Sequence, residues 1–190
     1  MDYKDTWDKI DWNSDETQVA EQINKFISDG AEINSQRKWD KQTVLMCAIR
    51  NRHEKAAHIL ISSGADINMK DCSGMTPLIF SAQNGIAELT EPLVKAGANI
   101  HDTNNNDENA LEWAVISGKN VKTITELLRL GADINRKSKY ATGNLAHTAT
   151  WYNHREILRT LFSAGIDMNA RNNKGAPLNY CCPKGTYGNR

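Results

Sequence analysis

Long apolar runs are missing from this sequence of 190 residues. A membrane-spanning helix needs roughly 20 mostly apolar residues, and no stretch of this chain comes near that length. The opening residues 1–15 are acidic and polar, unlike the basic and then apolar start of a secretory signal peptide. We therefore expect no membrane association and a cytoplasmic location, or the cytosol of a host if the protein is exported as an effector.

Cysteine is also scarce. The four cysteines are Cys47, Cys72, Cys181 and Cys182, and their spacing lacks the paired pattern of a zinc site. Reduced thiols in a cytosolic protein are the simplest interpretation. We expect no metal site.

Neither sign of charge is in excess, because 23 Lys and Arg residues balance 23 Asp and Glu residues. The average hides a gradient. Residues 1–121 carry 12 basic and 19 acidic side chains, or −7, whereas residues 122–190 carry 11 and 4, or +7. This asymmetry could orient a partner, guide head-to-tail self-association, or have no role.

What the sequence does have is a repeat. A string close to Gly-Ala-Asp-Ile-Asn occurs five times, beginning at Gly30, Gly64, Gly97, Gly131 and Gly165. These glycines are 34, 33, 34 and 34 residues apart. A fixed period of this length indicates one supersecondary unit stacked repeatedly, with each copy burying an apolar face against its neighbours.

A second recurring string is best preserved over residues 71–82. The hydroxyl of Thr76 suits a helix cap, and Pro77 suits the first helical position, where a missing N–H costs nothing. Gly97 suits the left-handed residue that follows a helix. Small residues recur where neighbouring helices are expected to approach closely, at Ala48, Ala82, Ala114 and Ala149.

The unit resembles the ankyrin repeat, whose pattern is Asp-x-x-Gly-x-Thr-Pro-Leu-His-x-Ala-Ala, then Gly-His, two apolar pairs and Gly-Ala-Asp-x-Asn. The resemblance implies an all-α solenoid of helix-turn-helix units with hairpin finger loops. On this alignment residues 1–190 form a single domain with a capping unit at 1–34, repeats at 37–68, 71–101, 104–135 and 138–169, and a partial repeat with tail at 172–190. Helices are expected at 43–51 and 54–62, and at 109–117 and 120–129.

Departures from the pattern carry further expectations. The Thr-Pro pair survives whole only at Thr76 and Pro77, so the other first helices must begin on different caps. The apolar residues Trp7, Ile10 and Trp12 are expected to cover the first helix pair.

The five histidines do not form a catalytic or metal-binding set. His53 and His154 fall on the turn histidine of the repeat and His147 on its helix-start histidine, where the family uses the ring as a structural hydrogen-bonding group. His58 and His101 have no neighbouring ligands at helical or loop spacing. We predict a protein that is not an enzyme and needs no cofactor.

A nucleic-acid partner is not expected either. The basic residues Arg136, Lys137 and Lys139 lie beside Tyr140 between two units. These charges alternate with polar side chains and belong to different faces, so they do not form one track for phosphates.

In ankyrin-like proteins the fingers and first helices line a concave strip that carries partner contacts. The resemblance places the partner-facing positions four, three and one residues before the helix-start threonine and seven and eight after it. By unit, these residues are Trp39, Asp40, Gln42, Arg50 and Asn51; Cys72, Ser73, Met75, Gln83 and Asn84; Asn105, Asn106, Glu108, Ile116 and Ser117; and Tyr140, Trp151 and Tyr152. The aromatic members bury large areas with few rotors, which favours partner contact. Phe80 and Trp113 are assigned to packing between units.

Two functions follow from these observations. The first is a non-catalytic protein–protein interaction module that binds another protein through its concave face, as an effector or inhibitor of a host or rival protein. The alternative is a self-assembling structural or adaptor protein that joins its acidic and basic halves, although a monomer is the favoured state.

Overall fold

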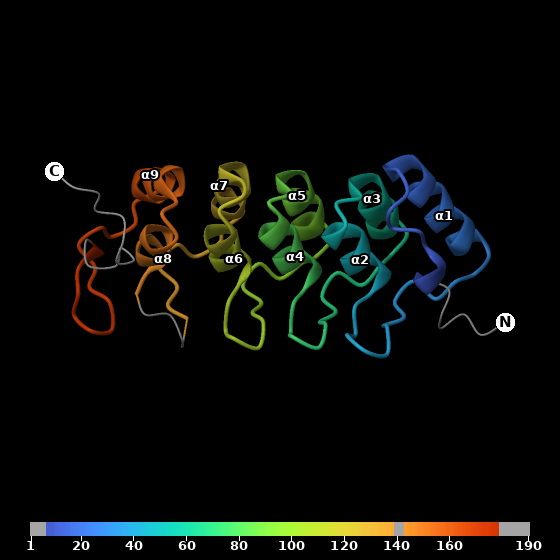
Figure 1. Ribbon diagram of the computed structural model, residues 1–190, viewed down its shortest axis with the longest axis horizontal. Helices are drawn as coiled ribbons and strands as arrows, with labels where there is room; N and C mark the ends of the chain where they lie inside the picture. The colour runs from blue at the N-terminus through green and yellow to red at the C-terminus, as the bar shows by residue number, and fades with distance from the viewer. Residues whose placement is uncertain (1–6, 139–142, 179–190) are drawn as a thin grey trace.

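A computed structural model describes residues 7–138 and 143–178 of the chain (Figure 1). Within these ranges the chain forms α-helices and isolated β-bridges but no β-strand, which confirms the all-α class. The helices, after a short 3-10 helix at Trp7–Lys9, are α1 (Glu16–Ser28), α2 (Val44–Arg50), α3 (Glu54–Ser62), α4 (Pro77–Asn84), α5 (Ala87–Lys95), α6 (Ala110–Ser117), α7 (Val121–Arg129), α8 (Leu145–Trp151) and α9 (Arg155–Ser163).

The helices lie in two rows that give the molecule an elongated shape (Figure 1). The outer row contains α1, α3, α5, α7 and α9, and the inner row contains α2, α4, α6 and α8. Finger loops extend beyond the inner row, and we call residues 36–43, 69–76 and 103–109 the first, second and third fingers. This arrangement confirms the expected solenoid.

The predicted helix limits agree with the structure to within a residue. The four helices placed from the sequence are observed at Val44–Arg50, Glu54–Ser62, Ala110–Ser117 and Val121–Arg129. The periodic apolar pattern was sufficient here because each helix is short and bounded by a cap and a turn.

Each inner helix begins on a side chain that accepts a hydrogen bond from an amide of the first turn. Thr76 accepts from the amide of Ile79 at 3.3 Å, and Pro77 is the first helical residue. Where the Thr-Pro pair is lost, Thr43, Asn109 and Asn144 are the caps. The expectation that other residues start these helices is thus confirmed.

The five repeat glycines follow the outer helices in the left-handed region, with φ between 81° at Gly30 and 100° at Gly97. A residue with a Cβ would be strained there. The chain can therefore leave each outer helix sharply and start the next finger.

The hydrophobic core lies between the two rows. Leu60, Leu93, Leu127 and Leu161 occupy the same position of successive outer helices and are all fully buried. The small residues of the inner row are buried as well, at Ala48, Ala82, Ala114 and Ala149. A larger side chain at these alanines would overpack the contact between neighbouring inner helices.

Asparagine side chains connect the loops that follow the outer helices. Asn34 Oδ1 accepts from the amide of Asp66 at 2.7 Å, and Asn68 Oδ1 accepts from the amide of Asn99 at 3.1 Å. His101 stands at the next position in this series, and within the described residues no side chain makes the corresponding bond to the amide of Asp133. The series ends at His101, and among the described residues Asn135 does not resume it with the amide of Asp167.

The N-terminal residues pack on the first helices. Trp7 and Ile10 are buried, and Trp7 Nε1 donates a hydrogen bond to the Glu32 carbonyl at 2.9 Å. His53 Nε2 donates to the Trp12 carbonyl at 3.0 Å. These contacts give apolar cover to the helix pair of α1 and α3. No helix in the described part of the chain is long and apolar enough to cross a membrane.

Candidate functional site

The second and third fingers are built on the same scaffold. In the second finger Asp71 Oδ1 accepts hydrogen bonds from the amides of Ser73 and Met75, each at 2.8 Å. In the third finger Asn104 Oδ1 accepts from two amides in the same way, at 2.9 and 3.0 Å. One buried acceptor therefore fixes the conformation of each tip.

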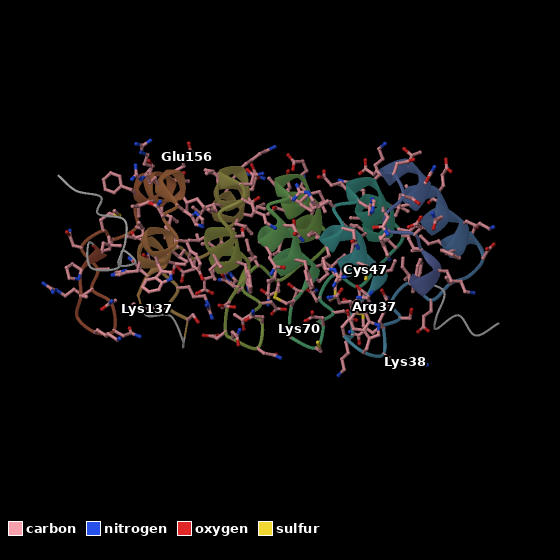
Figure 2. The ribbon with its side chains drawn as sticks, in the orientation of Figure 1. Arg37, Lys38, Cys47, Lys70, Lys137 and Glu156 are labelled. Carbon is pink, nitrogen blue, oxygen red and sulfur yellow. The ribbon has the colours of Figure 1, made fainter. Side chains whose placement is uncertain are left out.

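The first finger uses a different network, because Lys38 stands where the second finger has Asp71. The guanidinium of Arg37 forms an ion pair with the carboxylate of Asp40 and donates to Gln42 Oε1 at 2.9 Å. Asp40 Oδ1 also accepts from the amide of Gln42 at 3.0 Å. Figure 2 shows Arg37 and Lys38 on this finger. The tip of the first finger is thus held by the side chains that bind Arg37.

The same arginine positions Trp39. The guanidinium carbon of Arg37 lies 4.3 Å from the centroid of the Trp39 ring, a cation–π contact. Trp39 is nevertheless 70% exposed. The finger therefore presents a large apolar surface whose orientation is restrained before any partner arrives.

Backbone hydrogen bonds join the fingers to one another. The amide of Cys72 donates to the Asp40 carbonyl at 2.9 Å, and the amide of Asn105 donates to the Ser73 carbonyl at 2.9 Å. The approach is close, since a Cβ on Gly74 would lie 2.5 Å from Asn105 Oδ1. The three fingers consequently form one continuous surface.

A groove of about 510 Å³ lies between these fingers and the inner helices α2, α4 and α6. Eight residues that the sequence placed on the binding face line it, namely Gln42, Arg50, Cys72, Ser73, Met75, Gln83, Asn105 and Asn106. Phe80 and Trp113 contribute aromatic surface from α4 and α6. The groove therefore has an apolar base and a polar rim, a composition suited to recognising a protein.

The two aromatic residues in the groove serve packing, as expected. Phe80 is buried in the core, and Trp113 packs against it. Trp113 Nε1 is buried and finds no acceptor among the described residues. An unsatisfied donor of this kind costs on the order of 1–3 kcal/mol.

A smaller hollow of about 110 Å³ lies beside the third finger, lined in part by Glu108 and Ile116. At its edge Arg136 donates to Glu112 at 2.7 Å and to Asp107 at 2.6 Å. Burial raises the pKa of Glu112, an effect opposed by the hydrogen bond from the helix-cap amide and by the charge of Arg136. The arginine therefore compensates two carboxylates and ties the third finger to the segment that follows α7.

Two further exposed aromatic residues lie at the C-terminal end of α8. Trp151 is 57% exposed and Tyr152 is 48% exposed. The Tyr152 ring stacks on His154 with centroids 5.8 Å apart, and His154 Nε2 donates to the Ile116 carbonyl at 3.2 Å. The histidine anchored to α6 thus supports one face of the tyrosine.

Comparison with known families agrees with this geometry. The family model described as "Ankyrin repeats (3 copies)" matches residues 16–104, 57–138 and 82–172, which together cover most of the chain. The chain belongs to the ankyrin repeat family. Ankyrin repeats are in general protein–protein interaction modules, and the family is in general non-catalytic.

Individual relatives are distant and longer. The chain is 28% identical over 156 residues to the putative ankyrin repeat protein FPV244 of fowlpox virus, covering 80% of the chain and 22% of that protein. It is 27% identical over 184 residues to the ankyrin repeat domain-containing protein M-T5 of myxoma virus, covering 89% and 38%. With human SH3 and multiple ankyrin repeat domains protein 2 it shares 29% identity over 171 residues, covering 88% and 9%. The chain thus spans well under half of each of these relatives.

The ankyrin fold exposes most of the residues expected on the binding face. Exposed members are Trp39, Arg50, Asn51, Cys72, Ser73, Asn105, Asn106, Trp151 and Tyr152. Half-buried members are Gln83, Asn84, Glu108, Ile116 and Ser117. Tyr140 lies outside the described residues.

Three members of the set are corrected by their burial. Asp40, Gln42 and Met75 are only 7%, 6% and 5% exposed. Asp40 and Gln42 are engaged with Arg37, while Met75 Sδ lies 3.6 Å from Asn104 Nδ2. Gln42 and Met75 line the groove, but none of the three side chains offers much surface to a partner.

His53, His147 and His154 have structural hydrogen-bond partners among the described residues. His53 and His154 donate to carbonyls of other units, and His147 Nδ1 lies 2.7 Å from the Asn144 side-chain oxygen at the start of α8. In the described part of the chain no three His, Cys, Asp or Glu residues are grouped so that they could hold a metal ion.

Sequence reasoning missed the role of Arg37. A signal was present, because Lys38 replaces the usual aspartate while an arginine precedes Asp40 by three residues. Lys41 also stands in the glycine position of the finger and adopts φ 58°. Together these departures indicate a finger held by a different network.

Proposed function

We propose that this chain is a non-catalytic binding module that engages another protein through the groove and the exposed residues of its fingers. The observation that carries the proposal is the joint presence of a 510 Å³ groove lined by eight anticipated residues and of Trp39, 70% exposed on the adjoining finger. Exposed and restrained aromatic residues are common centres of binding energy. Folding of the stack gives no reason for their exposure.

The finer role proposed is that of an effector or inhibitor, acting in the cytoplasm or in the cytosol of a host. Its support is the similarity to ankyrin repeat proteins of two poxviruses, which cover 80% and 89% of the chain. A module that only holds or masks a partner needs no catalytic group, and the groove contains a polar rim rather than a reactive cluster.

The test begins with a partner captured from the native setting by crosslinking and identified by mass spectrometry. Its affinity is then measured for the wild-type chain, for Trp39→Ala and for the double variant Trp39→Ala with Trp151→Ala. Loss of a hot-spot side chain typically costs about 2 kcal/mol or more, so affinity should fall by about 30-fold for Trp39→Ala and further for the double variant.

The matched control is Phe162→Ala, since Phe162 is 64% exposed but lies on the outer helix α9. We expect this variant to bind as the wild type does. A partner that binds the double variant with unchanged affinity would contradict the proposed face.

The alternative is self-assembly through the ends of the stack. It is favoured by the exposure of Phe162, because the same position is half-buried at Val94 and Leu128 in the preceding outer helices. The opposite charges of residues 1–121 and 122–190 would bring unlike ends together. Light scattering at low and high salt separates the two proposals. If the molecular mass is that of a monomer at both salt concentrations, self-assembly is rejected.

A further inference from the structure

The first finger and the adjoining end of α2 carry exposed cations that form no ion pair with a described residue. Lys38, Lys41 and Arg50 are exposed, and no described residue forms an ion pair with any of them. By contrast, Lys70 of the second finger pairs with Asp102 at 3.6 Å. Arg50 also lines the groove. The surface around Trp39 therefore carries excess positive charge.

The acidic groups nearby do not cancel this charge. Asp40 is committed to Arg37, and Asp71 is buried with Oδ1 accepting from two amides. Glu32 shares a surface hollow with Lys38 but forms no ion pair with it. The local surplus is notable because residues 1–121 carry −7 in total.

The first finger also has an open backbone edge. The residue four positions before the helix cap donates its amide to the preceding finger at both Cys72 and Asn105, each at 2.9 Å. Trp39 holds this position in the first finger, and its amide donates to no described group. No finger precedes it in residues 7–35, so a carbonyl of another molecule can take that place.

We propose that this edge, together with the groove, recognises an extended acidic segment of a partner protein that carries an apolar side chain. A backbone carbonyl of the segment accepts from the Trp39 amide, as a neighbouring finger would. Its apolar side chain packs on the restrained Trp39 ring, and its carboxylates face Lys38, Lys41 and Arg50. In this mode of recognition the backbone hydrogen bonds of the added segment supply affinity. Its alternate side chains supply selectivity.

A protein segment fits these features better than a nucleic acid does. Three cations contact few phosphates, and the acidic N-terminal part of the chain repels a long polyanion. A short acidic segment avoids that repulsion because its charge is confined to the finger.

This inference rests on the proposed binding function and names the chemistry of the partner. The probe is a displayed library of random linear peptides of about 12 residues, which reach about 40 Å when extended. Peptides are selected on the full-length chain, and enriched sequences are synthesised. We expect net negative peptides containing an aromatic or aliphatic residue.

Each enriched peptide is then tested against three variants. Trp39→Ala should weaken binding by about 30-fold, and the combined change Lys38→Gln, Lys41→Gln, Arg50→Gln should weaken it by about tenfold at about 0.05 M salt and less at about 0.3 M. The control is Lys25→Gln, Lys55→Gln, Lys95→Gln, which changes the net charge equally on the outer helices and should leave binding intact.

Several outcomes would overturn the inference. If neutral or basic peptides are enriched and their binding still depends on Trp39, the acidic character of the partner is rejected. The proposed binding function would still hold. Failure to enrich any peptide, or tighter binding of a poly-dT oligonucleotide than of the peptides, would also reject the inference. The combined change at Lys25, Lys55 and Lys95 could weaken binding as much as the combined change at Lys38, Lys41 and Arg50. In that case only the overall charge matters and the proposed edge is wrong.

Discussion

Neighbouring repeats at the front of the stack are joined by hydrogen bonds and by exposed ion pairs such as Lys70–Asp102, whereas the junction to the last repeat contains the half-buried arginine Arg136. At the front, the Cys72 amide donates to Asp40, and Asn68 accepts from Asn99. At the rear, Arg136 bridges two carboxylates at 2.6 and 2.7 Å. The comparison teaches that one repeat fold tolerates two kinds of junction, and that salt should screen the exposed ion pairs of the front more than the half-buried pairs of Arg136.

The largest expected difference concerns equivalent core leucines. Leu93 in α5 and Leu161 in α9 are both fully buried, but α5 has a repeat on either side. We expect Leu93→Ala to lower the free energy of unfolding by about 3 kcal/mol. Leu161→Ala should affect the whole stack less, because a terminal repeat can open by itself.

Urea unfolding of both variants, with amide exchange to locate the opening, measures this difference. Alanine at Leu161 should increase exchange mainly in α8 and α9. Equal losses of global stability in the two variants would mean that the stack unfolds as one unit. The central and terminal repeats would then not differ in their contribution to stability.

The next effect is at the charged junction. Arg136→Gln removes the guanidinium that pairs with Glu112 and Asp107, and we expect it to cost about 2 kcal/mol. Arg129→Gln is the control, because Arg129 forms only exposed ion pairs on the outer row, which contribute about 0.5 kcal/mol or less. Denaturant unfolding at two salt concentrations tests this, and similar losses for the two arginines would go against a special role for Arg136.

A smaller effect is expected on acidification. Burial lowers the pKa of His147, and a hydrogen-bonding interaction of the ring with the backbone carbonyl of Ala176 acts in the opposite direction. The unfolded chain therefore binds a proton more readily, so stability is full above the ordinary histidine pKa of about 6.5 and is lost as pH falls through the lower folded value. The loss should reach at most about 1 kcal/mol.

Unfolding at about pH 7.5 and about pH 5.5 measures this change, and His147→Gln should reduce it. His58→Gln is the matched control, since His58 is exposed on α3. If the histidine control flattens the pH dependence as much as the His147 variant, the cause lies elsewhere.

The smallest effect concerns the loop after α5, where the asparagine series of the front repeats ends at His101. His101→Asn restores the side chain that at Asn68 bonds the amide of the next loop, and we expect a gain of about 0.5–1 kcal/mol. The measurement is thermal unfolding alongside His58→Asn, which should be neutral. A destabilised His101→Asn protein would show that the loop at Asp133 is held in a different position.

The repeat pattern was enough to predict the helices, the left-handed glycines and the cap at Thr76, since all of these depend on residues within one unit. It also placed Gln83, Asn105 and Asn106 on the groove. It failed for Asp40, because its burial comes from an ion pair with Arg37 that the pattern does not contain. It did not anticipate that Arg136 would meet Glu112, a contact between side chains 24 residues apart.

By itself the sequence determined that this protein is a stack of helix pairs, because a period near 33 residues is local information repeated along the chain. Only the tertiary structure decided which side chains of the expected binding face are exposed and that the Trp39 amide donates to no described group. Exposure, ion pairing and an unused amide depend on what the neighbouring units bring into contact, and no single repeat specifies that.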